Sequence, residues 1–278
     1  MSGYRAGLGQ LLVEGGRPAA NLDRAAAMTE QAAREGCRVV VLPECLDFGW
    51  TDPSARERAE PIPGPHSDRL AEAARAYGIW VVAGLVERAG NRLYNASILL
   101  DPSGRIVLHH RKINELGIGR EIYAVGGRLE VAETELGTVA IPICADNYWS
   151  SRAVGHLLCR MGAQVLLSPS AWAVVPDHDE TVEPYGDDWL PSYRELATLY
   201  DVTVIGVSNV GLMTGGPWEG RLCIGKSLAV GPGGEILAHG PYGVDAETLL
   251  VVDVVPRTSV AAGTDMAAAL HARGYDGP

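Results

Sequence analysis

The chain has 278 residues, of which 47% are hydrophobic, a length and composition typical of a globular protein with a large buried core. Its formal net charge of −11 excludes a nucleic-acid-binding surface, which needs a basic stripe. No apolar run approaches the roughly 20 residues that span a bilayer, so the sequence predicts no membrane segment.

Strand-like apolar runs alternate with helix-period patterns along the chain, which is typical of an α/β protein. Strands are predicted at residues 4–12, 37–43, 79–87, 92–100, 105–109, 128–133, 138–143, 164–168, 202–208, 224–230, 235–238 and 247–253. Helices are predicted at residues 21–35, 70–77, 154–161 and 190–200. Asn21 is the expected N-cap of the first helix. Residues 173–188 are predicted to be a long acidic loop, and residues 257–278 a C-terminal tail.

Two stretches of the first half recur in the second half at nearly equal offsets. Residues 36–43 (GCRVVVLP) are echoed 126 residues later at 162–169 (GAQVLLSP), and the hairpin from Ser97 is echoed 130 residues later at Ser227. These offsets predict two pseudo-repeated halves. Because no linker separates the halves, we expect one domain over residues 1–278, with two sheets that share a core and are flanked by helices. The alternative is a chance match, because Pro-x-Gly turns are common.

Five cysteines are scattered along the chain without the Cys-x-x-Cys spacing of zinc sites. Their odd number excludes a full disulfide framework and favours a reducing, cytoplasmic compartment. The N-terminus lacks the basic region, apolar core and cleavage site of a signal peptide. His109 and His110 are neighbours on one strand and should face opposite sides, so they do not form a metal pair. No metal site is predicted.

Three reactive side chains stand where predicted strands end: Glu44, Lys112 and Cys144. In open α/β sheets, ligands bind outside the carboxyl ends of the strands. A nucleophilic cysteine needs a base to take its proton, which Glu44 can supply, and a positive group beside the developing oxyanion, which Lys112 can supply. Each residue also has a structural alternative. Cys144 could be a small buried core residue, Glu44 a solvated strand terminus, and Lys112 a surface charge.

Lysine is rare in this chain, because 21 of the 23 basic residues are arginines. Lysine offers a compact ammonium whose pKa shifts on burial, whereas arginine stays charged. We therefore expect a specific task for Lys112. The other lysine, Lys226, lies in a Gly-x-Ser segment and is expected either to reach the substrate pocket or to be a surface lysine.

The ordered set of residues 42–44 (LPE), residues 111–113 (RKI) and Cys144 resembles the Glu-Lys-Cys signature of the nitrilase superfamily of carbon–nitrogen hydrolases. The resemblance covers most of the chain. It includes Gln10, Asn21 and residues 169–172, 208–211 and 227–234. It implies an α-β-β-α sandwich, usually assembled as a homodimer or a higher homo-oligomer, without a cofactor. This agrees with the prediction of two halves.

Members of this superfamily also use a second glutamate shortly after the lysine. Glu121, nine residues after Lys112, is the expected match, and Glu115 is the fallback. After the cysteine this chain reads ADNYW at residues 145–149. Many family amidases instead carry an aromatic residue, Asp and an Arg-Phe-Pro-Glu-like run, and true nitrilases carry Trp-Glu-Asn. The choice between amide and nitrile therefore stays open at this point.

The resemblance implies a cysteine-dependent amidohydrolase of the amidase-like branch. It would convert a small polar amide to a carboxylate and ammonia or an amine through a thioester on Cys144. Glu44 would act as base, and Lys112 with the N–H of Ala145 would hold the oxyanion. Further candidates for substrate contact are Asn147, Trp172 and Lys226. The alternatives are hydrolysis of a nitrile at the same site and a non-catalytic scaffold on the same fold.

Overall fold

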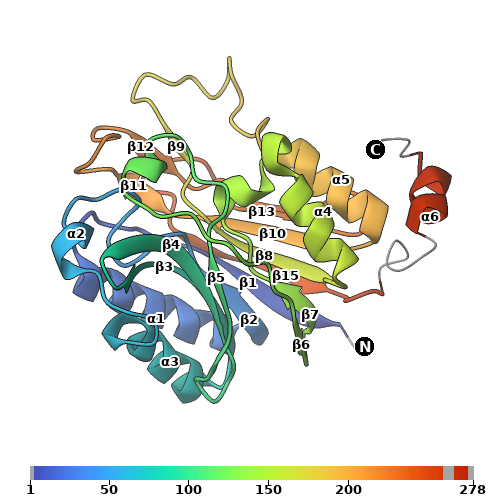
Figure 1. The fold of residues 1–278 in the computed structure, drawn as a ribbon, viewed down its shortest axis with the longest axis horizontal. Helices are drawn as coiled ribbons and strands as arrows, with labels where there is room; N and C mark the ends of the chain where they lie inside the picture. Colours follow the sequence, from blue (N-terminus) through green and yellow to red (C-terminus); the bar gives the residue numbers. More distant parts are fainter. Residues whose placement is uncertain (1–2, 259–265, 275–278) are drawn as a thin grey trace.

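The computed structural model describes residues 3–258 and 266–274, which form two packed β-sheets with helices on their outer faces (Figure 1). The first six-stranded sheet has the order β15-β1-β2-β3-β4-β5. Its strands are β1 (Tyr4–Gln10), β2 (Cys37–Val41), β3 (Trp80–Ala89), β4 (Arg92–Leu100), β5 (Ile106–Arg111) and β15 (Thr248–Val254). The helices α1 (Pro18–Arg34) and α3 (Pro65–Tyr77) pack against this sheet.

The second six-stranded sheet has the order β14-β13-β10-β8-β7-β6. Its strands are β6 (Ala132–Thr134), β7 (Gly137–Ala140), β8 (Val165–Ser170), β10 (Thr203–Ser208), β13 (Leu228–Val230) and β14 (Ile236–His239). The helices α4 (Ala153–Arg160) and α5 (Leu190–Tyr200) cover it. A small third sheet joins β9 (Ala173–Val174), β11 (Val210–Leu212) and β12 (Leu222–Ile224).

The two large sheets share one topology. In each, three parallel strands lie at the centre, β1-β2-β3 in the first and β7-β8-β10 in the second. An antiparallel hairpin follows on one side, and one antiparallel strand closes the other side. The repeated stretches in the sequence correspond to β2 with β8 and to the hairpin β4-β5 with β13-β14. The predicted α-β-β-α sandwich of two related halves is confirmed.

Three buried apolar layers hold the sandwich together. The central layer lies between the sheets and includes Val39, Val41, Leu167 and Val207. A second layer joins α1 and α3 to the first sheet, and a third joins α4 and α5 to the second sheet. Strands buried on both faces read as continuous apolar runs, which explains why β2 and β10 could be predicted from the sequence.

Several element boundaries differ from the predictions. The first helix begins at Pro18, so Asn21 is inside it rather than its cap, and its side chain bonds the backbone of Glu14 and Asp47. The predicted strand 224–230 is divided into β12 and β13 because Gly225 and Lys226 both have positive φ. The short helix α2 (Ala55–Arg58) is not among the predicted helices.

The predicted tail is described only in part, because residues 259–265 and 275–278 lie outside the described residues. Its described part includes α6 (Met266–Ala272), whose Leu270 is buried in the layer around α5. Arg273 donates hydrogen bonds to the carbonyls of Thr198 and Leu199 at the end of α5. This part of the tail therefore packs on the sandwich.

Among residues 3–258 and 266–274, no helix combines the length and the apolar character needed to cross a bilayer.

Candidate active site

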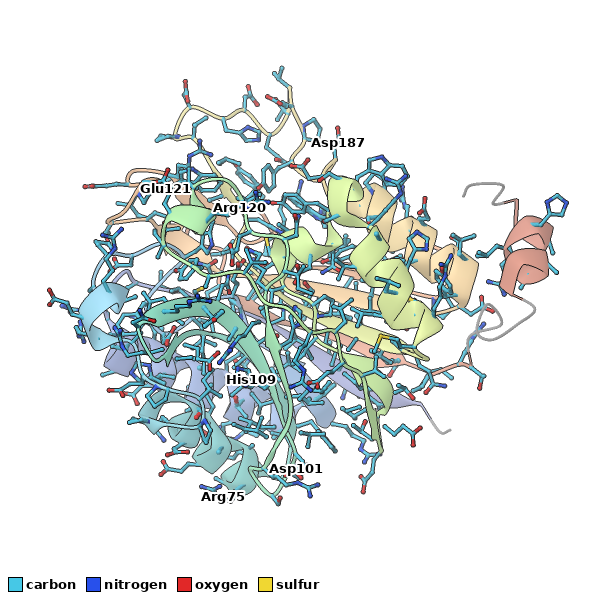
Figure 2. The ribbon with its side chains drawn as sticks, in the orientation of Figure 1. Arg75, Asp101, His109, Arg120, Glu121 and Asp187 are labelled. Carbon is cyan, nitrogen blue, oxygen red and sulfur yellow. The ribbon has the colours of Figure 1, made fainter. Side chains whose placement is uncertain are left out.

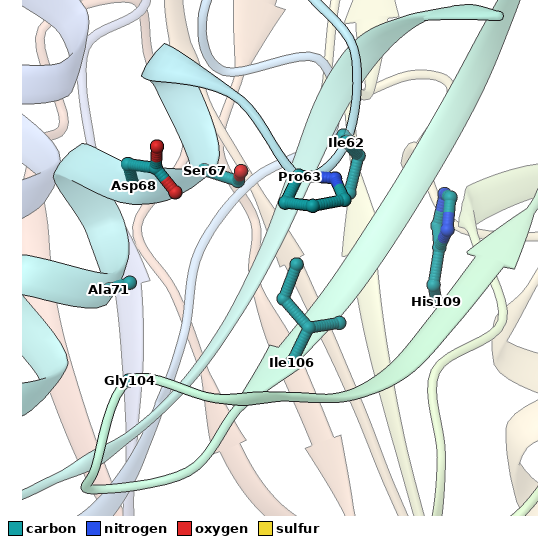
Figure 3. Close-up of a pocket in the computed structure, with 8 residues that line it drawn as sticks. All are labelled: Ile62, Pro63, Ser67, Asp68, Ala71, Gly104, Ile106 and His109. Atoms are coloured by element: carbon teal, nitrogen blue, oxygen red, sulfur yellow. The ribbon is translucent and has the colours of Figure 1, made fainter.

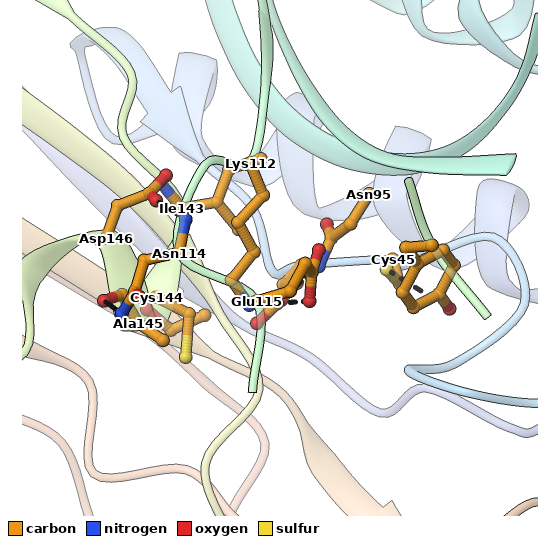
Figure 4. A network of polar contacts seen from close by, with 12 residues as sticks. Cys45, Asn95, Lys112, Asn114, Glu115, Ile143, Cys144, Ala145 and Asp146 are labelled. Carbon is orange, nitrogen blue, oxygen red and sulfur yellow. Dashed lines mark hydrogen bonds and ion pairs between the residues drawn. The ribbon is translucent and has the colours of Figure 1, made fainter. Parts of the chain in front are cut away.

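The side chains at the three strand ends form a buried cluster, in which the charges of Glu44 and Lys112 act on the Cys144 thiol. Figure 4 shows Lys112, Glu115 and Cys144 of this cluster. Glu44 follows β2, Lys112 follows β5, and Cys144 begins the short 3-10 helix η2 (Cys144–Asn147) after β7. Lys112 Nζ donates to Glu44 Oε1 over 2.6 Å. The three residues are 2%, 1% and 4% exposed, respectively, so water hardly reaches them. The base, the cation and the thiol predicted from the sequence are thus brought together.

Cys144 occupies a sharp bend between an extended residue and η2. Ile143 is extended, and Cys144 has φ +41°, a conformation that non-glycine residues adopt only when the surroundings enforce it. The Cys144 N–H donates to Ser168 Oγ over 3.1 Å, and Asn147 Nδ2 donates to the same oxygen over 2.9 Å. Ser168, on β8, therefore fixes the turn that carries the thiol.

The resting thiol of Cys144 is protonated. Burial and the negative charge of Glu44 raise its pKa to about 12, although the Lys112 ammonium opposes the rise. A thiol with such a pKa becomes a nucleophile only when a base removes its proton during the reaction. Glu44 is the carboxylate that interacts with this thiol.

Lys112 lies between two carboxylates. Its Nζ is 2.6 Å from Glu44 Oε1 and 3.9 Å from Glu115 Oε2. Burial alone would lower the pKa of Lys112, but the charges of Glu44 and Glu115 outweigh it and hold this pKa well above its ordinary value. The lysine is therefore a permanent buried cation beside Cys144.

Glu115 is buried next to Lys112, with only 2% of its surface exposed. Burial raises the pKa of Glu115 to about 7, the charges of Glu44 and Asp146 add to the rise, and Lys112 opposes it. The carboxyl group therefore titrates near neutral pH, where a small change of environment changes its charge.

Asn95, on β4, is a further member of the cluster. Its Nδ2 donates to Glu44 Oε1 over 2.5 Å, and its backbone carbonyl accepts the N–H of Lys112 over 2.8 Å. Since Asn95 and Lys112 both bind Oε1 of Glu44, the other oxygen, Oε2, is left for proton transfer.

Asp146 ties the turn of the cysteine to the strand of the lysine. Its Oδ1 accepts the N–H groups of Ile113 and Asn114 over 3.1 and 2.7 Å. Its Oδ2 accepts the N–H of Ile143 over 3.0 Å and lies 2.9 Å from His110 Nε2. Burial opposes ionisation of Asp146, but these hydrogen bonds and His110 outweigh it and lower its pKa. Asp146 thus sets the spacing between Lys112 and Cys144.

Aromatic rings wall the site on the side of the acidic loop. Trp172 belongs to the same buried cluster as Cys144 and stacks on Trp189, with ring centroids 4.2 Å apart and an interplanar angle of 8°. Tyr185 contacts Trp189 edge-on at 4.6 Å. The loop that follows β9 is therefore packed onto the site through three rings.

Lys226 anchors this loop. Its ammonium forms an ion pair with Glu180 and donates to the carbonyl of Tyr185 over 2.7 Å. Lys226 is 7% exposed and adopts φ +58°, so it is not a solvated surface lysine. Together with Tyr185 and Trp189 it lines a cleft of about 220 Å³. Through Tyr185, Lys226 is connected to the aromatic side chains beside Cys144.

Another cleft, of about 290 Å³, lies between α3 and β5 (Figure 3). Ile62, Pro63, Ile106 and His109 give it an apolar lining with one titratable ring. None of its lining residues belongs to the cluster around Cys144. It is therefore separate from the candidate active site.

Comparison with known families now adds to this geometry. The carbon–nitrogen hydrolase family model matches residues 5–262, nearly the whole chain. The chain belongs to the carbon–nitrogen hydrolase family. The hydrolase predicted from the Glu-Lys-Cys pattern is confirmed.

Curated relatives agree with this assignment. The omega-amidase NIT2 of Xenopus tropicalis is 28% identical over 91% of this chain and 89% of its own length. The omega-amidase NIT2 of Danio rerio is 33% identical over 66% of this chain and 69% of its own length. A nitrilase of Pyrococcus abyssi is 30% identical over 80% of this chain and 79% of its own length.

Solved structures share the fold of this hydrolase. The amidase from Nesterenkonia sp. AN1 matches with a TM-score of 0.76 at 22% identity, over 91% of this chain and 93% of its own. A carbon–nitrogen hydrolase from Helicobacter pylori matches with a TM-score of 0.78 at 21% identity, over 90% of this chain and 88% of its own. The sandwich of two related halves is thus common to these proteins.

The expected second glutamate needs a correction. Glu121 lies in the 3-10 helix η1 (Gly119–Glu121) and is exposed, with its side chain next to Arg120 at the outside of the molecule (Figure 2). Glu115 is the residue within ion-pair distance of Lys112. The irregular chain after Lys112 directs the Glu115 side chain toward the buried cluster, whereas η1 directs the Glu121 side chain toward solvent. The geometry therefore favours Glu115 as the second glutamate.

A pair of glutamine substitutions tests this correction in the hydrolase. Glu115→Gln is expected to lower kcat/KM about 10²-fold, because a charge 3.9 Å from the ammonium interacts by up to about 4 kcal/mol at an effective dielectric of 20. Activity of the wild type should rise with pH through about 7 as Glu115 ionises, and this limb should vanish in the variant. Glu121→Gln is the matched control and should leave the profile unchanged. Equal losses in the two variants would contradict the assignment.

The anchor at Lys226 makes a second prediction. Glu180→Gln removes the partner of Lys226 and should raise KM about 5- to 10-fold, because a charge-assisted hydrogen bond is worth about 1.5–3 kcal/mol before screening. Limited proteolysis should cut the loop faster. Glu183→Gln alters an exposed carboxylate of the same loop and should change neither readout. An unchanged KM in Glu180→Gln would contradict a role of the Lys226–Glu180 ion pair in positioning the aromatic side chains that line the site.

Three residues of the site, Asn95, Ser168 and Asp146, are not among those predicted from the sequence. Asn95 carries a weak signal, because it shares the inward face of β4 with Ser97 and Leu99, where a fully apolar strand would place hydrophobic side chains. Asp146 stands out in the sequence only as part of an unusual run after the cysteine. Asn147 was predicted to contact substrate, and the structure ties its amide nitrogen to Ser168.

Proposed function

We propose that this hydrolase cleaves the C–N bond of a small polar amide through a thioester on Cys144. The observation that carries the proposal is the buried Glu44–Lys112 ion pair beside a thiol that is protonated at rest. The relatives named omega-amidase support an amide as substrate. An ω-amide of a small acid is the first substrate to test.

In the acylation half, Glu44 Oε2 takes the proton of the Cys144 thiol while the sulfur attacks the carboxamide carbon. The oxyanion that develops is held by the Lys112 ammonium and by the N–H of Ala145, in the first turn of η2, where N–H groups lack partners within the helix. The protonated Glu44 then gives its proton to the leaving nitrogen. Ammonia or an amine departs, and the acyl group remains on sulfur.

In the deacylation half, Glu44 removes a proton from water as the water oxygen attacks the thioester carbon. Collapse of the tetrahedral species expels the Cys144 thiolate, which regains a proton from Glu44. The carboxylic acid leaves, and the resting state is restored. Glu115 would keep Lys112 in place through both halves, and Trp172 would line the acyl pocket. This sequence of steps needs no cofactor.

Hydrolysis of a nitrile is the second candidate, because a relative at 30% identity is named a nitrilase. The same thiol would then attack a nitrile carbon and pass through a thioimidate. Release of ammonia from ω-amides, aryl amides, ureas and nitriles separates the two functions. We expect turnover of an ω-amide. Turnover of nitriles without turnover of the matching amides would overturn the proposal.

We also propose that the hydrolase assembles as a homodimer or a higher homo-oligomer. An exposed apolar stripe supports this: Trp149, Leu157 and Met161, on and beside α4, are 43%, 49% and 45% exposed. Leu157→Glu with Met161→Glu is therefore expected to shift the molar mass measured by light scattering to that of one chain. An exposed apolar residue outside the stripe, Ile236→Glu on β14, is the control and should leave the mass unchanged. A single-chain mass already in the wild type would contradict the assembly.

A cytoplasmic, reducing location is part of the proposal. The five cysteines are all free and buried in the described chain, which suits a compartment that keeps thiols reduced.

We also propose a single domain over residues 1–278. The layer between the sheets, which joins the two halves, supports it.

A further inference from the structure

We propose that this hydrolase has a second binding site, for a small phosphoryl-bearing anion, in a cleft outside the active site. The cleft lies where α2, the turn between β3 and β4, and the segment after η1 meet, and its volume is about 460 Å³. Pockets for small ligands have volumes of about 300–1,000 Å³. None of Glu44, Lys112 and Cys144 lines this cleft.

Four arginines line the cleft: Arg56, Arg88, Arg92 and Arg120. No carboxylate is among the lining residues, although Glu57 and Glu121 are their neighbours in the sequence. In a chain with a net charge of −11, four arginines without a lining carboxylate form an unusual positive concavity. The guanidinium fork matches the geometry of phosphoryl oxygens and binds two of them at once.

Two of the four arginines are held in place by the backbone. Arg88 Nε donates to the carbonyl of Ala59 over 3.0 Å, and its terminal nitrogen donates to the carbonyl of Arg56 over 2.5 Å. Arg120 Nε donates to the carbonyl of Glu115 over 3.2 Å. These contacts fix part of the site before a ligand arrives, which lowers the entropic cost of binding.

The other two arginines are free to close on a ligand. In the described chain, the side chains of Arg56 and Arg92 form no ion pair or hydrogen bond, and both are exposed. Two preorganised guanidinium groups and two free ones can surround an anion that carries more than one phosphoryl group. A pyrophosphate group has this charge and size.

The rest of the lining suits an organic phosphate. Leu93, Ile122 and Tyr123 add apolar surface beside the arginines, and Asn91 adds an amide. Tyr123 is itself fixed, because its hydroxyl oxygen accepts the N–H of Thr51 over 3.0 Å. A ligand with a phosphoryl group and a carbon skeleton would therefore fill the cleft better than an inorganic ion alone.

Thermal unfolding of the full chain tests the site with sodium pyrophosphate as probe. At saturating pyrophosphate we expect the Tm to rise by about 2–4 °C relative to sodium chloride of equal ionic strength. Succinate at equal ionic strength should give a smaller rise, because carboxylates present fewer oxygens to the four arginines. A rise with succinate as large as that with pyrophosphate would overturn the phosphoryl assignment.

Arginine variants inside and outside the cleft test whether the rise in Tm comes from pyrophosphate bound in this cleft or on another cationic surface. The double variant Arg56→Gln with Arg92→Gln removes side chains that have no partner in the described chain, so it should fold normally and lose the rise in Tm. Arg75→Gln, on α3 and far from the cleft, should keep it (Figure 2). No rise in the wild type, or an equal rise in the double variant, would overturn the proposal. Calorimetric titration should give one pyrophosphate per chain.

Discussion

Replacement of Cys144 by serine is expected to lower kcat with an amide substrate by at least about 10³-fold while the fold stays intact. Serine is nearly the same size, and the backbone N–H of residue 144 would still donate to Ser168 Oγ. The alcohol is a much weaker nucleophile than the thiolate, and Glu44 would have to deprotonate a group of far higher pKa. The measurement is ammonia release under single-turnover and steady-state conditions.

The matched control for this substitution is Cys37→Ser. Cys37 lies at the start of β2, and burial raises the pKa of its thiol to about 11. It is thus another buried, protonated thiol, but it is not part of the cluster around Glu44. Its replacement should leave kcat unchanged. Comparable losses in both variants would mean that the defect comes from folding and not from the nucleophile.

Replacement of Lys112 by methionine is expected to cost about 3–5 kcal/mol of stability, because it leaves two buried carboxylates without their cation. In a chain of this size, the Tm should fall by roughly 5–9 °C. The loss should be smaller at lower pH. Lys112 lowers the pKa of Glu115, which is about 7 in the wild type, so this pKa rises further in the variant. Protonation of Glu115 as the pH falls then removes one of the two unpaired charges.

A double variant separates this charge effect from a packing effect. Adding Glu115→Gln to Lys112→Met removes one unpaired carboxylate, so part of the lost Tm should return, although activity should not. The coupling between the two sites should exceed about 0.5 kcal/mol, as expected for residues in contact. Additive losses of Tm would contradict the picture of one cation that holds two buried carboxylates.

The fold and three of the site residues could be predicted from the sequence because they depend on short-range patterns. β2 and β8 are apolar runs that end in proline-containing segments, and their spacing reveals the two halves. Lys112 follows β5 directly and Glu44 comes shortly after β2, so their places follow from the ends of those strands. The rarity of lysine also distinguishes Lys112 in a chain whose basic residues are nearly all arginines.

The remaining features of the site could not be predicted, because they depend on segments without regular secondary structure. Whether Glu115 or Glu121 faces Lys112 is decided by the path of residues 113–127, which contain no strand and one short 3-10 turn. The left-handed conformations of Cys144 and Lys226 are imposed by tertiary contacts, which no local pattern reveals. Asp146 is visible in the sequence, but its four partners come from segments more than 30 residues away or from the turn itself.

The central claim is that the acyl group of the amide passes through Cys144. Rapid acid quench during turnover, followed by peptide mass spectrometry, tests it most directly. We predict that the peptide containing residue 144 gains the mass of the acyl group, and that hydroxylamine removes this mass, as expected for a thioester. Turnover with no acyl group on Cys144, or with the acyl group on another residue, would contradict the account.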